Sequence, residues 1–512
     1  MRPGAAGAAA GADAAATGDG AADHAGTDGA APGGGRPPGG PRGRAGDPAG
    51  AYAADAGPGR TGAGSVAPER EGPRRAGAGA GAGAVGAGRE STAGAATGGT
   101  SGARGRPLSR AFDSLAIRNY RLYFWGYAVS IAGTWMQTLA LAFLVLRLTG
   151  SGADLGVATA ARYLPLALLG PFGGLIADRY DRRRLLYVTQ SASAVVALAF
   201  ALMTALGQAS YAGVVVLSLA LGVLTVVDNP ARQSLIGDLV PRERLANAVT
   251  LNSVSVNLAR VLGAAAGGAL VAGVGLTTCF VLNAASFAGV LASLFLMRPA
   301  EMNPVERPPR EKGQVRAGLR YAFQTPALLL PLVMITVTGA LAYEFPVTLP
   351  LVARGALHGG AGTYGAMASV MGLGAVLGGL VTASRGNPKR SSTLAIAAVG
   401  WGVAITAAAL APSLPWELVA LLFVGYGSVS FNALSKTALQ LAAAPAMRGR
   451  VMALWALAWG GTTVVGGPLV GWVAQDIGTR WSLAVGGVPT ILLGLLMLPA
   501  LRHMDPRPTP ST

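Results

Sequence analysis

The chain has 512 residues, of which 52% are hydrophobic and only 12% are charged, and its formal net charge is +17. Soluble proteins carry about 25% charged residues, so this composition excludes an ordinary soluble protein and favours a membrane protein. The basic residues lie in short clusters between apolar runs, without an aromatic RNA-binding motif, so nucleic acid is not an expected partner. The single cysteine, Cys279, excludes an intramolecular disulfide, and we expect neither a metal nor a cofactor.

Residues 1–106 are rich in Ala and Gly, with scattered Pro, Asp and Arg, and show no periodic apolar pattern. Such a segment cannot bury enough apolar surface to offset its chain entropy, so we expect it to be disordered. It lacks the apolar core of a signal peptide, which predicts a cytoplasmic tail. A regulatory role, a dispensable extension and a start site assigned too far upstream all remain open.

Twelve apolar runs follow, each close to the roughly 20 residues that a helix needs to cross a bilayer. We therefore predict an all-α membrane protein with twelve transmembrane helices. The expected spans are 122–147, 153–177, 185–206, 211–231, 246–272, 275–297, 327–353, 361–384, 392–411, 414–439, 449–474 and 480–501.

Basic residues are concentrated in every second loop between these runs. One side of the membrane receives clusters such as Arg182 to Arg184, whereas the opposite loops hold little beyond Arg147, Arg354 and Arg480. Because short cytoplasmic loops carry the excess of Lys and Arg, this predicts cytoplasmic termini and a cytoplasmic connection at 298–326. The expected location is the inner or plasma membrane.

Two sequence features recur at almost the same interval. Gly173-Gly174-Leu175 returns 205 residues later at Gly378, and the turn that opens with Pro241 returns 204 residues later at Pro445. A duplicated six-helix unit explains both intervals, with halves at 107–297 and 327–502 and a short cytoplasmic tail at 503–512. Parallel six-helix halves joined by a basic loop are typical of carriers that work by alternating access.

The loop between the second and third spans runs from Gly173 to Arg184 and reads GGLIADRYDRRR. It resembles the signature of major facilitator transporters. The resemblance implies a cytoplasmic gate that closes in the outward-facing state, made of Gly174, Asp178, Arg182 and Arg183. Asp181 stands where the family has glycine, and in the second half Ala383 replaces the aspartate, so only one gate is intact.

Further motifs resemble the proton-antiporter branch that includes the enterobactin exporter and multidrug exporters. The span-five run from Ala259 to Gly268 resembles the glycine-rich antiporter motif, with Ala264 in place of its usual proline. The arginine motif of span four is missing between Val214 and Val226. The other matching segments are Phe112 to Leu115, Arg118 to Arg121, Pro230 to Gln233 and Asp238 to Pro241.

Four ionisable residues fall inside spans, where a charge costs about 3 kcal/mol and therefore needs a reason. Glu344 lies alone in span seven beside Pro346, which marks a break in the helix; it is either a proton and substrate site or a structural group. Arg162 either faces the cavity or extends towards the outer surface. Arg260 should face the cavity or pair with an acid, and Asp228 is its best partner in sequence, unless Asp228 simply ends its helix.

Trp135 and Gln137 in span one are candidates for the cavity wall, with ordinary helix packing as the alternative. The sequence predicts a monomeric proton-coupled exporter of small amphipathic molecules, of drug or siderophore type, embedded in the lipid bilayer. An uptake carrier or lipid flippase on the same fold, and a transport-inactive scaffold or sensor, are the alternatives. No phosphate-binding glycine loop, metal constellation or nucleophile motif is present, so we do not expect an enzyme.

Overall fold

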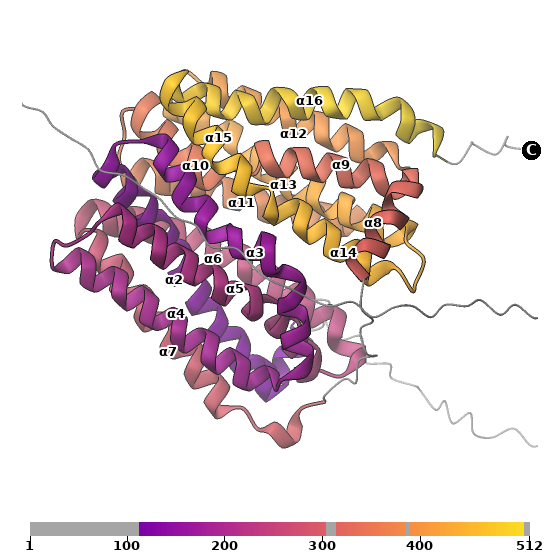
Figure 1. The fold of residues 1–512 in the computed structure, drawn as a ribbon, viewed down its shortest axis with the longest axis horizontal. Coiled ribbons are helices and arrows are strands. Elements are labelled where there is room, and N and C mark those ends of the chain that lie inside the picture. Colours follow the sequence, from indigo (N-terminus) through magenta and orange to yellow (C-terminus); the bar gives the residue numbers. More distant parts are fainter. Residues whose placement is uncertain (1–111, 304–313, 386–389, 506–512) are drawn as a thin grey trace, which may run out of the picture. The chain divides into compact units, whose positions relative to one another are not determined.

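The computed structural model describes residues 112–303, 314–385 and 390–505. The expected tail at 1–106 and most of the expected tail at 503–512 lie outside these ranges. Two groups of helices make up the described part, the indigo to magenta helices α2 to α7 and the orange to yellow helices α9 to α16 (Figure 1).

The first group holds α2 (Arg118–Thr149), α3 (Gly152–Arg179), α4 (Arg182–Ala205), α5 (Tyr211–Leu239), α6 (Leu245–Gly273) and α7 (Leu276–Leu296). Side chains and glycine fix where these helices begin and end. Ser151 accepts a hydrogen bond from the amide of Asp154 at the start of α3, and Gly150 takes a left-handed conformation after α2. Asp181, the departure from the family pattern, accepts from the Arg184 amide and begins α4.

The connecting segment contains the short amphipathic helix α8 (Gln314–Gln324). The second group follows as α9 (Pro326–Leu341), α10 (Phe345–Leu351), a π-helical turn η4 (Val352–Ala356), α11 (Ala361–Arg385), α12 (Ser392–Leu410) and α13 (Leu414–Ala442). It ends with α14 (Arg448–Ala456), the π-helical turn η5 (Leu457–Gly461), α15 (Thr463–Asp476) and α16 (Thr479–His503).

Eleven helical segments of the described residues are long and apolar enough to cross a membrane. The remaining one, α3, passes the same test as two pieces that meet at a bend of 68°. Their outward faces are apolar as well, since Leu168 is 65% and Leu496 is 73% exposed. A surface of this kind requires lipid rather than water. The predicted all-α fold with about twelve spans is therefore confirmed, and most span limits agree within a few residues.

The two halves pack their helices in equivalent ways. In the first half α3 lies on α5, and in the second half α11 lies on α13. Gly173 and Gly378, the repeated glycines, leave room at these crossings for the backbone carbonyls of Val226 and Tyr426. A Cβ at either position would overlap the neighbouring backbone, so the repeat seen in sequence has a physical cause in close helix packing.

At the end with the basic loops, the motif segments Phe112 to Leu115 and Arg118 to Arg121 connect helices of the first half. Asp113 forms an ion pair with Arg244 at 3.0 Å, and the amide of Asn119 donates to the Arg298 carbonyl at 2.9 Å. The hydroxyl of Tyr120 donates to the Ala248 carbonyl at 2.7 Å. These motif residues therefore stabilise the ends of α2, α6 and α7 and do not face the space between the halves.

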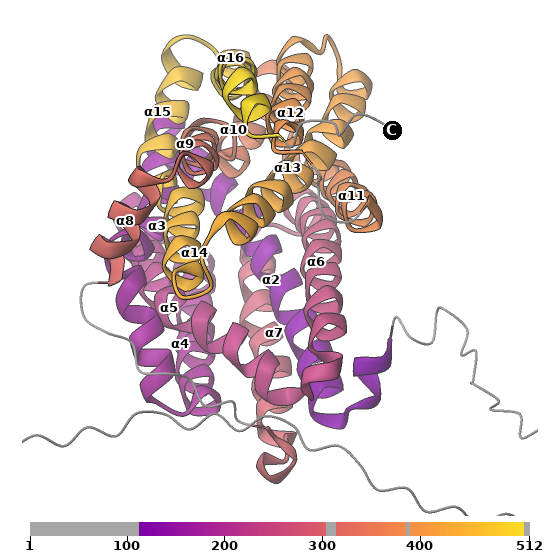
Figure 2. The ribbon, with the colours of Figure 1, turned by 90° about the vertical axis from the view of Figure 1, so that its right-hand side faces the viewer.

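The halves meet along two seams, α3 against α15 and α6 against α11, and the second is visible in Figure 2. Glycines lie opposite each other in both seams, Gly156 against Gly467 and Gly268 against Gly365. Hydrogen bonds reinforce the contact at the end whose loops lack basic clusters, from Ser151 to Gln475 at 2.7 Å and from Arg354 to the Leu146 carbonyl at 2.9 Å. We call the contact between the halves at this end, including Gly156 against Gly467, the outer seam. It is closed in this structure.

Candidate functional site

A cavity of about 260 Å³ lies within the first half. Its walls come from α2, α3, α4, α5 and α7, and Pro346 of α10 contributes from the second half. The lining combines apolar side chains with many hydroxyl and amide groups, which suits a small amphipathic molecule. Its polar members include Ser130, Thr134, Gln137, Thr138, Arg162, Gln190, Asp228, Asn229, Arg232 and Asn283.

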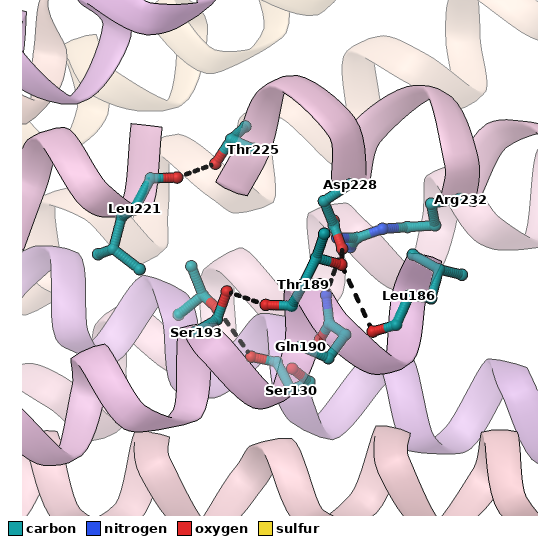
Figure 3. A network of polar contacts seen from close by, with 10 residues as sticks. Ser130, Leu186, Thr189, Gln190, Ser193, Leu221, Thr225, Asp228 and Arg232 are labelled. Atoms are coloured by element: carbon teal, nitrogen blue, oxygen red, sulfur yellow. Dashed lines mark hydrogen bonds and ion pairs between the residues drawn. The ribbon is translucent and has the colours of Figure 1, made fainter. Parts of the chain in front are cut away.

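Asp228 is the centre of a polar cluster on the cavity wall (Figure 3). The hydroxyl of Thr189 and the side-chain amide of Gln190, both on α4, donate to its Oδ1 at 2.8 and 2.6 Å. Its Oδ2 forms an ion pair with Arg232, one turn further along α5. Arg232 also lies over the ring of Tyr127, 4.3 Å from the centroid. Both carboxylate oxygens are therefore bonded, and the cluster fixes the negative charge.

The cluster corrects two expectations about Asp228. It does not pair with Arg260, because Arg232 occupies that role. It does not end its helix either, since α5 continues through Pro230 to Leu239. The limit predicted at residue 231 had placed Arg232 outside span four, so the arginine in that helix was missed.

The other predicted cavity residues surround the same space. Trp135, Gln137 and Arg162 all line the cavity, so Arg162 does not extend to the outer surface. The side-chain oxygen of Gln137 accepts a hydrogen bond from the Asn283 amide at 2.6 Å and is thereby held by α7. Arg162 forms no ion pair among the described residues, and the next residue, Tyr163, lies within electrostatic reach of both Arg162 and Glu344.

Arg260 lies behind Trp135, with its guanidinium carbon 5.8 Å from the centre of that ring. Its Nη2 donates to the side-chain oxygen of Asn257 at 3.1 Å, whereas its Nε is buried without a hydrogen-bond partner. Across the junction between the halves, Arg260 interacts electrostatically with Tyr343. The positive charge thus remains free of any carboxylate in the described part of the chain.

Glu344 lies at the break in span seven, between α9 and α10, where Pro346 predicted it. The side chain is 1% exposed, and neither carboxylate oxygen makes a hydrogen bond of acceptable geometry. The hydroxyl of Thr463 is the polar group that interacts with it. The oxygens lie against the backbone of Gly466 and Gly467 on α15, directly behind the contact with Gly156 in the outer seam.

The predicted gate residues lie at the opposite end of α3 and α4. Asp178 is exposed there. Arg182 donates to the Asp238 carboxylate at 2.6 Å, and Arg183 donates to the Leu294 carbonyl at 2.7 Å. Both arginines therefore join α4 to neighbouring helices of their own half. Gly174 is partly buried, next to the tightly packed Gly173.

Sequence reasoning missed a second carboxylate and a row of aromatic side chains. Glu417, in the first turn of α13, is fully buried with both oxygens unbonded, and Arg480 is its electrostatic neighbour. Trp455 and Trp459 stack in parallel with centroids 6.0 Å apart, and Lys436 lies over Trp455. Glu417 lies only a few residues into its apolar run, so its position gave no signal of burial, and aromatic spacing alone does not show which rings meet.

Comparison with known proteins gives the family. The family described as "Transmembrane secretion effector" matches residues 109–510. The chain is 25% identical to "Enterobactin exporter EntS" of Citrobacter koseri, covering 77% of this chain and 95% of that protein. It is also 25% identical to "Multidrug efflux pump Tap" of Mycolicibacterium fortuitum, covering 73% and 94%. It spans only 48% and 38% of the length of two other relatives, from Bacillus subtilis and Staphylococcus aureus.

Solved structures agree with this assignment at the level of the fold. A bacterial homologue of the human lysosomal transporter Spinster superposes with a TM-score of 0.56 at 16% identity, covering 78% of this chain and 97% of that one. The family match spans most of the chain, and the described helices have the length and apolar surface that membrane crossing requires. The chain therefore belongs to the major facilitator superfamily and is a multi-pass membrane protein.

Proposed function

We propose that the protein exports small amphipathic molecules, of drug or siderophore type, by proton antiport with alternating access. The observation that carries this proposal is Glu344, a buried carboxyl group at the seam between the halves whose oxygens make no hydrogen bond of good geometry among the described residues. The relatives named as an enterobactin exporter and a multidrug efflux pump support export as the direction.

The position of Glu344 suggests how a proton controls the outer seam. An ionised carboxylate is costly where water is excluded and no well-aligned hydrogen bond compensates it, so the closed seam holds the neutral, protonated group. Once the proton leaves, the charge is relieved only if the seam opens and water reaches the carboxylate. Gly466 and Gly467 transmit this opening, because the same stretch of α15 contacts Glu344 and Gly156.

This switch gives exchange if the proton enters from outside and leaves inside. Protonation in the outward-facing state lets the outer seam close and the inner end open. Release of the proton to the cytoplasm then destabilises the closed seam, and the carrier returns outward with bound substrate. One proton moves in for each substrate moved out, and the basic loops with Asp178, Arg182 and Arg183 act as the cytoplasmic gate.

Asp228 has a different role in this scheme. Its carboxylate already receives hydrogen bonds from Thr189 and Gln190 and an ion pair from Arg232. A group bonded in this way resists protonation, so we assign it to the fixed wall of the substrate cavity rather than to proton transfer. Arg162, Trp135 and Gln137 complete that wall, and the carrier works as a monomer.

The proton switch can be tested without knowing the substrate. Spin labels at Arg147→Cys and Ile477→Cys, on a Cys279→Ala background, would report the distance across the outer seam. In the parent protein this distance should increase as the pH rises, because the ionised carboxylate opens the seam. Glu344→Gln cannot ionise, so its seam should stay closed at every pH.

Glu417→Gln is the matched control, because it removes an equally buried carboxyl group away from the seam. It should follow the pH response of the parent. In proteoliposomes, a panel of drugs and siderophores should cause substrate-dependent proton flux that Glu344→Gln abolishes. A pH response or proton flux that persists in Glu344→Gln refutes the assignment, and uptake instead of export would reverse the direction.

A further inference from the structure

We infer that the substrate is an organic anion with a planar aromatic ring. The inference rests on the proposed function and names its substrate class; the residues that carry it share Trp135 with the cavity described above. It comes from a line of four aromatic and two basic side chains that crosses from one half to the other. In order, its members are Trp135, Arg260, Tyr343, Trp459, Trp455 and Lys436.

The first-half end of the line offers an unneutralised positive charge on an aromatic surface. Arg260 lies over Trp135 and shares only one hydrogen bond, with the neutral side chain of Asn257. Its buried Nε has no partner. A buried cation without an acidic neighbour is costly, and an anionic ligand that accepts from the guanidinium would remove that cost.

Tyr343 forms the middle of the line. It precedes Glu344 at the break in span seven, so its ring is not constrained by a continuous helix. Its hydroxyl donates to the Ser428 carbonyl at 2.7 Å, and its ring lies 4.7 Å from that of Trp401. These contacts hold the ring in place, where it interacts electrostatically with Arg260 and meets the ring of Trp459 edge-on, with centroids 6.2 Å apart. A rigid platform of this kind favours stacking, because little side-chain entropy is lost.

The second-half end presents an open aromatic surface on an unusual backbone. Trp459 lies in the π-helical turn η5, a distortion that is frequent at functional sites. It is 42% exposed, whereas Trp401 in the same aromatic group is 1% exposed and belongs to the core. Trp455 is fixed by its Nε1, which donates to Ser435 at 3.2 Å, and carries Lys436 at 5.4 Å. The open ring face and the nearby ammonium group together suit an aromatic acid.

Charge decides between the possible ligand classes. Neither Arg260 nor Lys436 forms an ion pair with a carboxylate in the described ranges. A cationic aromatic compound would therefore meet two uncompensated positive charges, while an aromatic acid would neutralise one of them. Such a ligand would also touch both halves at once, which couples its binding to their relative movement.

The test uses four probes of similar size on the full-length protein in nanodiscs: 1-naphthoate, 1-naphthamide, 1-naphthylmethylammonium and decalin carboxylate. Binding is measured by calorimetry. The parent protein should bind naphthoate at least about tenfold more tightly than each other probe, because charge and ring contribute separately. Equal affinity for the anion and the ammonium compound would overturn the inference.

Two variants assign the affinity to the line. Arg260→Gln should weaken naphthoate binding by about tenfold and leave naphthamide unchanged. Trp459→Leu should weaken both naphthalene probes and leave decalin carboxylate unchanged. Arg147→Gln and Trp416→Leu, which alter exposed residues elsewhere, are the matched controls and should bind as the parent does.

The outcome is separable from that of the proposed function. If the seam of the parent opens with pH and that of Glu344→Gln does not, while naphthoate fails to bind selectively, the proton switch stands and the substrate class is wrong. If naphthoate binds through Arg260 and Trp459 but no proton flux accompanies transport, the substrate class stands and antiport is wrong.

Discussion

The two halves share one helical plan and handle buried charge in opposite ways. In the first half, Asp228 has both oxygens bonded and its partner Arg232 is stacked on an aromatic ring. In the second half, Glu344 and Glu417 are as deeply buried, yet none of their oxygens makes a hydrogen bond of good geometry with the described residues. A bonded carboxylate keeps its charge, whereas an unbonded one can exchange a proton. In the function proposed above, the first half supplies the wall of the substrate cavity and Glu344 of the second half carries the proton.

The largest effect should follow from removing one partner of the bonded pair. Arg232→Met leaves the buried Asp228 carboxylate without its counter-ion, which should lower the free energy of unfolding by about 3 kcal/mol. The double variant Asp228→Leu with Arg232→Met should recover part of this loss, because no uncompensated charge remains. Unfolding in mixed micelles of increasing denaturing detergent measures both values.

A variant in the second half tests the same comparison from the other side, because its carboxyl group has no ion-pair partner among the described residues to lose. Glu344→Gln breaks no hydrogen bond of good geometry, so its cost in unfolding free energy should be clearly smaller than that of Arg232→Met. If the two variants were equally destabilised, the distinction between a bonded and an unbonded carboxylate would fail. Arg147→Met, at an exposed site, controls for the loss of a positive charge alone.

The fold was largely predictable because a helix that crosses a bilayer requires a long apolar run, which is easy to recognise in a sequence. Apolar runs of sufficient length, interrupted by basic loops, predicted every span, and Pro346 predicted the break in span seven. The family motif predicted where Arg182 lies, although not that Asp238 would be its partner. These features are local in sequence, so they can be recognised without knowing which helices contact each other.

What failed depended on contacts between distant helices. Pro230 looked like the end of span four, but α5 tolerates it. Proline leaves the carbonyl four residues earlier, that of Val226, without its usual donor, and Gly173 on α3 lets that region pack closely. The partner of Asp228 was misjudged for the same reason, because the true span included Arg232. The aromatic line likewise draws on five spans that no sequence pattern connects, those that contain α2, α6, the break between α9 and α10, α13, and α14 with η5.

A smaller effect should come from filling the outer seam, where both halves contribute glycine. At Gly156 an added Cβ would collide with the Gly467 backbone. Gly156→Val should therefore oppose closure by about 1–3 kcal/mol, which shifts the population towards the open seam by about fivefold to 150-fold. The distance between labels at residues 147 and 477 should lengthen even at low pH.

Gly362→Val is the control for this substitution, because a Cβ at Gly362 meets open space. Its distance distribution should match that of the parent. If Gly156→Val also left the distance unchanged, the seam would not be the contact that separates the closed from the open state, and the scheme for Glu344 would lose its structural basis.

The smallest effect concerns the contacts between helix ends on the side with the basic loops. The first half uses ion pairs between arginine and aspartate there, whereas the second half uses a carboxylate that accepts hydrogen bonds from backbone amides. Asp505 follows α16 and accepts hydrogen bonds from the amides of Ser391 and Ser392 and, at 2.6 Å, from the Ser392 hydroxyl. Burial alone would raise the pKa of Asp505, but these bonds and the charge of Arg390 outweigh it and hold the pKa below its ordinary value of 3.8.

A carboxyl group with a lowered pKa stabilises the fold above the pKa of its unfolded state, and the contribution disappears as the pH falls through the folded value. Asp505→Asn should therefore reduce thermal stability by less than about 1 kcal/mol at neutral pH, since the site is close to solvent. The difference from the parent should stay constant down to about pH 5, begin to shrink at about pH 4, and disappear only as the pH falls through the lowered pKa of folded Asp505. If the difference in stability between Asp505→Asn and the parent persisted at acidic pH, Asp505 would stabilise the fold through packing. Its ionised carboxylate would then not be what holds these helix ends together.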